Sequence, residues 1–592
     1  MNNNDTRKIK ILFLFILVTL GFIIFLGTLF YWTNIDRRLP KLVYKEVTHA
    51  TRGSIISSDE FRVATSKKLY KATIDTRNID PNKLELFVNL YSLYTGMDKK
   101  KLRRKIKSTK GTLVLSYKID PKNAKYLKVL AKKLFRYGVF KTYYDKKRDI
   151  AFLYGLSITQ SGERREYPAK DTLTPVVGYV KKIEKNGITK VTGVKGLERY
   201  YEDRLLSIQD ATIVGYKDIA NTIILNRDSV TSARIDGLDL HMTISLKLQK
   251  IIEKLLDKYK KELQAKEIVV GVMHSKSGAI LTLATSNRFN PDFIRREDYP
   301  NLNVTAIERI YEPGSVMKAI TFALLLKEKK INPYDLVRIF GGRYKLGRRT
   351  ITDTHKYEWL SAEDVIVHSS NVGTAQIAQK LDAIEFYEGL KDFGFSKKTG
   401  IDLPYEKRGI IPTLHRFKSE TYKATVGYGY GLEATFMQVL KAYNVFNNNG
   451  RIVTPYIASY FTSTDGKVVN IQRDKEAEVI PVSVAKRMKS ILKKVVQKGT
   501  ATNAKIKGLE IGGKTGTAHI AQGGKYVRKY NSSFFGFAND KQNRFTIGVL
   551  VREPKKPYHY FASLSAVPVF KEVVLRLVDE GYLSPKTIEN TN

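Results

Sequence analysis

An uncharged apolar stretch near the N-terminus sets the first constraint on this chain. Residues 11–32 read ILFLFILVTLGFIIFLGTLFYW, and none of them carries a charge. A helix of this length spans about 30 Å, the thickness of the hydrocarbon layer of a membrane. Tyr31 and Trp32 are typical of the interface between lipid and water. We therefore predict a transmembrane helix at residues 11–32, preceded by a cytoplasmic tail at residues 1–10.

A cleaved signal peptide is the alternative explanation of this stretch. Its apolar core would be shorter, and a cleavage site of the Ala-x-Ala type would follow, which is not the case here. Basic residues at positions 7–10 favour an N-terminus in the cytoplasm, although those at positions 37–41 weaken the asymmetry. Because no second such stretch follows, nearly all of the chain is expected on the far side of the membrane.

The excess of basic residues says less about partners than its size suggests. Lys and Arg number 102 against 58 Asp and Glu, a formal net charge of +44. Such an excess is typical of proteins that bind nucleic acids or anionic surfaces. The lysines are scattered and no nucleic-acid motif accompanies them, so we favour solvated surface charge and expect no nucleic-acid partner. The chain has no cysteine, which excludes disulfides and thiolate metal sites.

Residues 33–235 alternate short strand-like runs with basic helical segments. Residues 112–117 predict a strand, residues 123–135 a helix, and the densely basic residues 99–110 a solvated surface. The region has neither histidines at metal-ligand spacing nor a phosphate-binding loop. We therefore interpret it as a spacer or interaction module rather than a catalytic one.

A second unit is predicted at residues 236–578. It opens with a strand, an amphipathic helix and a hairpin, at residues 239–244, 246–263, 268–273 and 279–284. Helical patterns dominate residues 315–498, and strand patterns return at residues 508–551. A sheet formed from both ends of a domain around a helical block is an α+β fold. Residues 579–592 are expected to form a C-terminal tail, disordered from Leu583 onward.

The segment Tyr311-Glu312-Pro313-Gly314-Ser315-Val316-Met317-Lys318 is the first candidate for chemistry. A Pro-Gly turn precedes Ser315, and an apolar helix follows it. Residues three apart lie on one face of a helix, so the Ser315 hydroxyl and the Lys318 amine can meet. This is the geometry of a serine nucleophile beside an amine base. The alternative is that Ser315 only caps the helix.

The same Ser-x-x-Lys spacing occurs at Ser483/Lys486 and Ser490/Lys493. Both pairs lie on an amphipathic helix predicted at residues 482–496, and we expect them to be solvated. Only the pair at positions 315 and 318 follows a Pro-Gly break and opens a buried helix.

Two further motifs follow in the chain. Ser369-Ser370-Asn371 is the only Ser-x-Asn in the sequence, although such residues are also favoured in ordinary loops and helix caps. Lys514-Thr515-Gly516-Thr517 lies on a predicted strand, which we expect to pair with residues 533–537 and 545–550. Small residues there would let a substrate backbone approach closely. A second Lys-Thr-Gly, Lys398-Thr399-Gly400, lies in a predicted turn.

This ordered set of motifs within one α+β unit resembles the class B penicillin-binding proteins, which are monofunctional D,D-transpeptidases. Landmarks of that family match along almost the whole chain. They are Arg52-Gly53-Ser54-Ile55, Gly196-Leu197-Glu198, Thr399-Gly400-Ile401-Asp402-Leu403-Pro404, Gly427-Tyr428-Gly429 and Ala566-Val567-Pro568-Val569-Phe570. The resemblance implies a penicillin-binding/β-lactamase-like transpeptidase domain, an antiparallel sheet with a helical block, together with an elongated N-terminal α/β module and a single transmembrane helix.

Some positions depart from the family pattern or specify a subtype. Ala562-Ser563 stands where Gly-Gly is usual, and Thr435-Phe436-Met437-Gln438 where Thr-Pro-Leu-Gln is usual. The form Ser369-Ser370-Asn371-Val372-Gly373, with Asp353 and His355 upstream, is more similar to the cell-division type. The resemblance therefore favours septal cell-wall synthesis, with elongation as the alternative.

The resemblance implies that Ser315 is a nucleophile that forms an acyl-enzyme and that Lys318 is its general base. Lys318 can serve only as a neutral amine, so its pKa must fall. Burial, the helix N-terminus and Lys514 as a second cation would all act in that direction. Backbone N–H groups of Ser315 and Thr517 would form the oxyanion hole.

The remaining motif residues would handle protons and substrate. Ser369 would relay a proton to the leaving amine, and Asn371 would hold the base and the substrate amide. Lys514, also a catalytic residue, would bind the substrate's terminal carboxylate together with Thr515-Gly516-Thr517.

The family also implies the substrate and partners. The substrate would be the D-Ala-D-Ala end of peptidoglycan stem peptides, and an amine on a neighbouring stem would take the acyl group. β-Lactams would acylate the same serine. A lipid-linked glycan polymerase and other division proteins would be partners, and no cofactor or metal is expected. The chain would lie in the cytoplasmic (inner) membrane with its catalytic domain in the periplasm.

Other functions remain open at this stage. A D,D-carboxypeptidase or β-lactamase would use water as acceptor, although a β-lactamase is normally small and has no anchored N-terminal module. Glu202-Asp203-Arg204 suggests a bifunctional enzyme that also polymerises glycan, but Leu205-Leu206-Ser207 does not continue that motif. A non-enzymatic β-lactam sensor would need a cytoplasmic output domain, and only residues 1–10 precede the apolar stretch.

Overall fold

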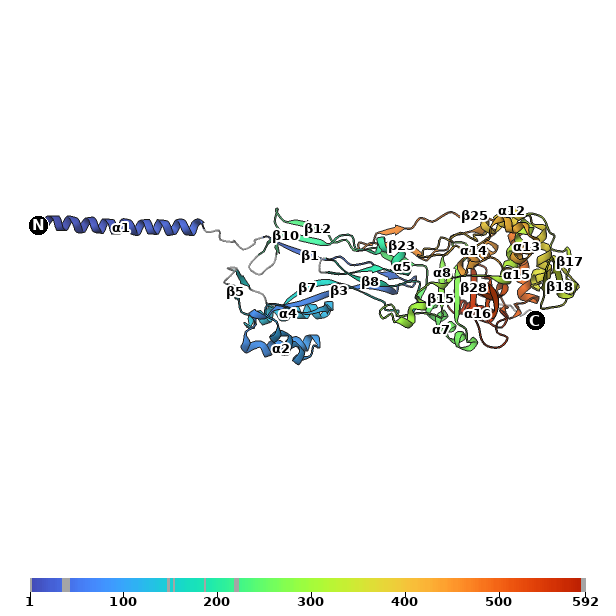
Figure 1. The fold of residues 1–592 in the computed structure, drawn as a ribbon, viewed down its shortest axis with the longest axis horizontal. Helices are drawn as coiled ribbons and strands as arrows, with labels where there is room; N and C mark the ends of the chain where they lie inside the picture. The colour runs from blue at the N-terminus through green and yellow to red at the C-terminus, as the bar shows by residue number, and fades with distance from the viewer. Residues whose placement is uncertain are drawn as a thin grey trace. The chain divides into compact units, whose positions relative to one another are not determined.

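The computed structural model describes residues 3–34, 43–145, 150–152, 155–185, 188–217 and 223–586 (Figure 1). The chain divides into two compact units. One unit comprises residues 1–48 and 210–234, and the other comprises residues 49–209 and 235–592.

The first unit contains the predicted membrane span. Helix α1 (Asn3–Asn34) includes residues 11–32, and its apolar window has a mean hydropathy of 2.9 with 0% of it buried inside the protein. The helix is therefore long and apolar enough to cross a membrane. The rest of the unit is a small antiparallel sheet. In it β10 (Ala211–Lys217) pairs with β1 (Val43–Thr48), β11 (Ile223–Ile224) and β12 (Val230–Ser232).

Residues 49–209 of the second unit form an α/β module with a core of its own. Its longest strand, β3 (Arg62–Asp75), pairs antiparallel with β4 (Thr112–Ile119) and β7 (Ser157–Glu166). Helices α2 (Leu84–Thr95), α3 (Lys99–Ser108) and α4 (Pro121–Arg136) contribute Phe87, Leu102 and Leu127 to this core. The predicted strand at 112–117 and helix at 123–135 are confirmed within a few residues.

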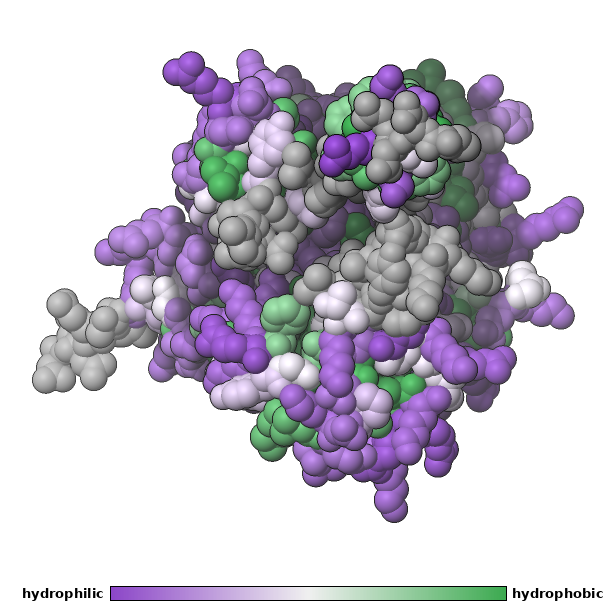
Figure 2. Space-filling view, turned by 90° about the vertical axis from the view of Figure 1, so that its left-hand side faces the viewer, coloured by the Kyte–Doolittle hydropathy of each residue, from purple (hydrophilic) through white to green (hydrophobic). Residues whose placement is uncertain are grey.

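The basic helix α3 explains how this module carries its charge. Leu102 and Ile106 are buried on one side, while the lysines at positions 99–101 are exposed, as predicted for a solvated surface. Hydrophilic side chains likewise dominate the face shown in Figure 2.

One sheet crosses the boundary predicted between residues 235 and 236. Its strands lie in the order β24-β23-β13-β2-β3-β7-β9-β8. The module supplies β2 (Ile55–Ile56), β8 (Val180–Lys185) and β9 (Ile188–Gly193). The C-terminal part supplies β13 (Asp239–Met242), β23 (Ala458–Thr462) and β24 (Val468–Asn470). Because β13 pairs with β2, backbone hydrogen bonds join the two parts.

A second sheet forms the centre of the C-terminal part. Its strands are all antiparallel and lie in the order β15 (Ile280–Thr285), β14 (Glu267–His274), β28 (Arg544–Arg552), β27 (Lys525–Asn539) and β26 (Glu510–Gln522). The first two are the predicted hairpin, and the other three return after the helices. The α+β prediction is therefore confirmed.

Helices cover both faces of this sheet. Phe534 of β27 packs on Phe570 of α16 (Ala566–Asp579), with ring centroids 4.7 Å apart. The next residue, Phe535, packs on Phe436 of α14 (Phe436–Asn447) at 5.2 Å. Consecutive residues of a strand point to opposite faces, so α14 and α16 lie on opposite sides.

The helical block lies between β15 and β26 in the chain. It contains α9 (Met317–Lys327), α10 (Ala362–Val367), α11 (Asn371–Ile377), α12 (Ala383–Asp392), α13 (Glu420–Gly427), α14 and α15 (Val482–Lys498). Helix α7 (Leu246–Leu263) precedes it, as predicted. Residues Met317–Leu325 of α9 are all buried, so this helix runs through the core.

The predicted disorder from Leu583 onward is wrong for the first residues of that segment. Leu583 is buried, and the backbone N–H of Lys586 donates to the carbonyl of Gly508 at 3.0 Å. An apolar side chain thus ties the segment after α16 to the core. Residues 587–592 lie outside the described part of the chain.

Candidate active site

Ser315 lies on a short 3₁₀ turn, η4 (Gly314–Val316), directly before α9. Gly314 has φ +66°, a left-handed conformation that glycine adopts without strain. The N-cap of α9 is Val316, and no side chain caps that helix. The alternative that Ser315 only caps a helix is therefore wrong. Among the described residues its hydroxyl makes no hydrogen bond, and the side chain lines a cleft.

Lys318 connects the first two motifs. Its Nζ donates to the Ser369 carbonyl at 2.6 Å and to Asn371 Oδ1 at 2.7 Å, and it lies 3.3 Å from Ser369 Oγ. The whole residue is buried. The structure thus brings Lys318, Ser369 and Asn371 together, while no hydrogen bond joins Ser315 to Lys318 among the described residues.

The loop between α10 and α11 presents Ser369 to this cluster. The neighbouring Ser370 is the N-cap of α11 and accepts from the Gly373 N–H at 2.8 Å. Ser369 itself has φ +61°, a conformation that costs a non-glycine residue about 1–3 kcal/mol. Ser370 therefore caps the helix, as the alternative explanation of this motif had it. Ser369 has the strained backbone, and its side chain lies near the lysines.

Lys514 approaches the same hydroxyl from β26. Its Nζ donates to Ser369 Oγ at 2.7 Å and to the Thr515 carbonyl at 3.1 Å, and its side chain is buried. Ser369 Oγ therefore lies between the amines of Lys318 and Lys514. Such a hydroxyl can accept a proton from one neighbour while it donates its own to another.

The Lys-Thr-Gly strand is the edge strand of the central sheet, and it packs against η4. A Cβ on Gly516 would lie 2.5 Å from Ser533 Oγ and 2.9 Å from Val316 Cγ1. Packing within the protein is thus a sufficient reason for glycine at this position. Thr515 bonds to Thr500 at 2.8 Å, and Thr517 Oγ1 accepts from the Ala562 N–H at 3.3 Å.

The two lysines have lowered pKa values, and burial, one of the expected causes, is the main one. Burial lowers the pKa of Lys318 to about 7, and the Asp353 carboxylate opposes this shift. Burial also lowers the pKa of Lys514 far below its usual value, and repulsion from Lys318 adds to it. The expected effect of burial on Lys318 is thus confirmed. The expected effect of Lys514 on Lys318 is not found, because the repulsion between the two lysines lowers the pKa of Lys514.

Asp353 organises the Ser-x-Asn loop. Its carboxylate accepts from Ser370 Oγ and from the Asn371 N–H, both at 2.5 Å, and from the Val372 N–H at 3.1 Å. The Asn371 amide also donates to the Thr352 carbonyl at 2.9 Å, which orients its Oδ1 toward Lys318. From the sequence, Asp353 was only a marker of subtype, since no local pattern links it to Asn371.

The cleft above these residues has a volume of about 670 Å³. It is lined by Ser315, Thr354, His355, His368, Ser369, Asn371, Tyr430, Thr500, Thr515, Thr517, His519, Tyr530, Tyr560, Phe561, Ala562 and Ser563. The motifs predicted Ser315, Ser369, Asn371 and the β26 threonines. They did not predict the aromatic wall or Thr500, which come from distant segments without a motif of their own.

The repeated motifs elsewhere do not form comparable sites. Ser483, Lys486 and Ser490 are exposed on α15, and Lys493 pairs with Glu510 at 3.2 Å. The turn Lys398-Thr399-Gly400 is held internally, because the Thr399 N–H and hydroxyl both donate to Glu406. The predicted exposure is confirmed for Ser483, Lys486 and Ser490, and none of these copies lines the cleft. Among the described residues, no three His, Cys, Asp or Glu side chains are grouped to hold a metal ion.

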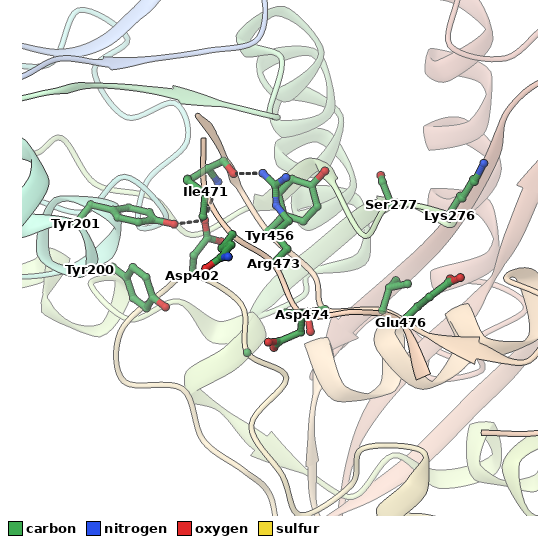
Figure 3. A pocket seen from close by; sticks show the side chains of 15 residues that line it. Tyr200, Tyr201, Lys276, Ser277, Asp402, Tyr456, Ile471, Arg473, Asp474 and Glu476 are labelled. Carbon is green, nitrogen blue, oxygen red and sulfur yellow. Dashed lines mark hydrogen bonds between the residues drawn. The ribbon is translucent and has the colours of Figure 1, made fainter. Parts of the chain in front are cut away.

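A second cavity, of about 360 Å³, lies where the module meets the C-terminal part (Figure 3). Asp402 is its most buried acid, and its carboxylate accepts from the Tyr201 hydroxyl at 2.9 Å and from two backbone N–H groups. Arg473 stacks on Tyr456 at 3.6 Å and donates to two carbonyls. Because these polar groups are engaged within the protein, we interpret the cavity as part of the junction.

The chain matches known families over most of its length. A family model for the penicillin binding protein transpeptidase domain matches residues 268–575, and one for the penicillin-binding protein dimerisation domain matches residues 47–242. The first includes every motif of the cleft, and the second the N-terminal module.

Individual proteins of known name are similar to this chain over the same regions. Stage V sporulation protein D of Bacillus subtilis is 30% identical over 438 residues, which are 71% of this chain and 65% of that protein, just under two thirds. A probable peptidoglycan D,D-transpeptidase PenA of Neisseria flavescens is 30% identical over 403 residues, 67% of this chain and 97% of that protein. The fold is similar to a crystal structure of penicillin binding protein 3 of Mycobacterium tuberculosis complexed with ampicillin. The TM-score is 0.66 at 20% identity, and the match covers 92% of this chain and 98% of the other.

Proposed function

Because the chain belongs to the class B penicillin-binding proteins, we propose that it is a peptidoglycan D,D-transpeptidase that works through an acyl-enzyme on Ser315. The observation that carries this proposal is the position of Ser369 Oγ, 2.7 Å from Lys514 Nζ and 3.3 Å from Lys318 Nζ, in a cleft that Ser315 lines.

In the first step the Ser315 oxygen attacks the carbonyl carbon of the penultimate D-Ala. The new C–O bond forms, the peptide C–N bond breaks, and the Ser315 proton moves to Lys318. A proton then passes through Ser369 to the leaving nitrogen of the terminal D-Ala. With a pKa of about 7, Lys318 is available as a neutral amine near neutral pH.

In the second step an amine of a neighbouring stem peptide attacks the ester. The new amide bond forms, the ester C–O bond breaks, and Ser315 regains its proton from the amine by the same route. Water in place of that amine would give the carboxypeptidase reaction. The buried base serves either acceptor, so the choice between them depends on which acceptor the cleft admits.

The edge strand β26 is suited to the anionic groups of the substrate. Lys514, with the hydroxyls of Thr515 and Thr517, donates to the terminal carboxylate, whose negative charge opposes the lowering of the Lys514 pKa by burial. The N–H groups of Ser315 and Thr517 stabilise the oxyanion, each donor contributing about 3–4 kcal/mol.

We place the reaction in septal wall synthesis, on the form of the Ser369–Gly373 motif with Asp353 and His355. The basic residues at positions 7–10 favour a cytoplasmic N-terminus, which puts the cleft in the periplasm. A lipid-linked glycan polymerase is then the natural partner, since it supplies the strands to be cross-linked.

Labelling with a fluorescent penicillin tests the proposal. The wild-type chain should be labelled covalently, Ser315→Ala should not, and Ser483→Ala, which alters a serine at the same spacing, should behave as wild type. Labelling of Ser315→Ala would refute the assignment of the nucleophile. Rapid release of the bound penicillin would indicate a β-lactamase, because a transpeptidase hydrolyses its penicilloyl ester slowly.

A further inference from the structure

A cavity of about 550 Å³ beside the cleft has only cationic groups among its charged lining residues. It is lined by Arg349, His415, Arg416, Lys418, Ser419, Thr421, Tyr422 and Thr425. We call it the basic pocket. Arg349 begins strand β19 (Arg349–Thr352). The other residues are in η7 (Leu414–Lys418), at Ser419 and in α13, which is labelled in Figure 1.

The cations of the basic pocket form no ion pair within the described part of the chain, although Glu420 lies in the first turn of α13. Arg349, Arg416 and Lys418 form no ion pair there, and Arg349 donates to a neutral group, Thr425 Oγ1, at 3.3 Å. Elsewhere in the same domain, Lys489 and Lys493 pair with Glu510 at 2.6 and 3.2 Å. The basic pocket thus gathers three cations that no carboxylate pairs with in the described part of the chain, and together they attract an anion.

Backbone groups add to this attraction. Ser419 is the N-cap of α13, and its hydroxyl accepts from the Tyr422 N–H at 3.4 Å. The first turn of a helix carries partial positive charge and free N–H groups. The pocket thus combines forked guanidinium donors with hydroxyls, a set that suits the planar, bidentate carboxylate group.

The basic pocket and the catalytic cleft share a wall. Tyr422 lines the pocket, and its hydroxyl donates to the Gly431 carbonyl at 2.6 Å. The preceding residue, Tyr430, lines the cleft. The Gly431 N–H donates to Glu312 at 2.7 Å, in the segment that leads to Ser315.

Strand β19 makes a second connection. Arg349 lines the basic pocket and Thr354, five residues later, lines the cleft. Their Cα atoms are therefore at most about 18 Å apart, a distance that about five residues of an extended peptide can cover. A peptide held in the cleft by its C-terminus can place a side group in the pocket.

We propose that the basic pocket binds a carboxylate of a peptidoglycan peptide, several residues away from the bond that reacts. This inference rests on the proposed function, because the peptide substrate is what makes a carboxylate available there. The carboxylate belongs either to the donor peptide that acylates Ser315 or to the acceptor peptide that resolves the ester.

The test compares the affinities of matched peptides for the full chain carrying Ser315→Ala, which prevents turnover. One donor peptide ends in D-Ala-D-Ala and bears a carboxylate about three to five residues upstream, and its partner bears a carboxamide there. An acceptor pair differs in the same way. Fluorescence polarisation then measures binding with and without Arg349→Gln and Arg416→Gln.

We expect each substitution to weaken binding of one carboxylate peptide by about tenfold and to leave its carboxamide partner unchanged. Whether the donor or the acceptor responds identifies the source of the carboxylate. Arg348→Gln is the matched control, since Arg348 is exposed on the same hairpin but does not line the pocket. The inference would be overturned if the carboxylate and carboxamide peptides bound with equal affinity, or if the substitutions weakened the binding of both equally.

Penicillin labelling separates this inference from the proposed function. With Ser315 present, Arg349→Gln and Arg416→Gln should be labelled at the wild-type rate, because neither residue lines the cleft that contains Ser315. A wild-type chain that takes no label would refute the proposed function, whereas normal labelling without carboxylate selectivity would refute only the inference.

Discussion

Two clusters of buried charge in this protein are organised in opposite ways. In the N-terminal module, Arg52 pairs with Glu198 and Glu202 at 2.8 Å each, and Arg165 pairs with Glu198 at 2.7 Å. Beneath the cleft, Lys318 and Lys514 are equally buried, but neither pairs with a carboxylate among the described residues.

The pKa values follow from this difference. Burial alone would raise the pKa of Glu198, but Arg165 and Arg52 lower it on balance, so the carboxylate stays charged. Burial lowers the pKa of Lys318 to about 7 against the weaker influence of Asp353. Buried charges with full counter-charge hold a fold together, whereas a buried amine without it becomes a base.

The largest expected effect comes from removing the amine beneath the cleft. Lys318→Met should slow acylation by penicillin about 10²–10⁴-fold, the usual contribution of a general base. The thermal midpoint should not fall, since methionine fills the space without burying an amine. Lys486→Met is the control for the same spacing on α15 and should acylate normally. If Lys318→Met were acylated at the wild-type rate, Lys318 would not be the general base.

The corresponding change in the module should affect stability instead. Glu198→Gln leaves Arg52 and Arg165 buried without their shared partner, which should lower the free energy of unfolding by about 3–5 kcal/mol. Denaturant unfolding measures this loss, and the folded variant should still take up penicillin. Glu85→Gln breaks the exposed pair with Arg103 and should change little. Equal stability of the two variants would contradict the contrast between the clusters.

The convergence of the three motifs could be predicted because each lies at a recognisable point of a local element. Ser315 follows a Pro-Gly break before an apolar run. Lys514 lies in a strand-like run, and further strand-like runs follow it in the chain. The register confirms the pairing with residues 533–537, since Lys514 lies opposite Phe535. The expected pairing with residues 545–550 is wrong, because that strand pairs with the other side of β27, where Phe535 lies opposite Gly548. The family landmarks beginning at Arg52 and Gly196 also meet, in the buried ion pairs of the module.

The details that tune the site could not be predicted, because they depend on contacts between distant segments. Asp353 reaches the Asn371 N–H from another loop, and nothing in its own surroundings in the sequence indicates this. The left-handed backbone at Ser369 depends on Ser370 taking the capping role. The degree to which Lys318 is buried, and so its pKa, is set by the packing of the whole helical block.

The pH dependence of Ser315 acylation tests the central claim most directly. The pKa of Lys318 falls from 10.5 to about 7, so the neutral amine forms as the pH rises through about 7. The acylation rate constant should therefore rise about tenfold per pH unit below that value and level off above it. Since Asp353 raises the pKa of Lys318, Asp353→Asn should shift the rising part of the pH–rate profile to lower pH. A rate that stays constant between about pH 5.5 and pH 9 would contradict a neutral Lys318 as the base.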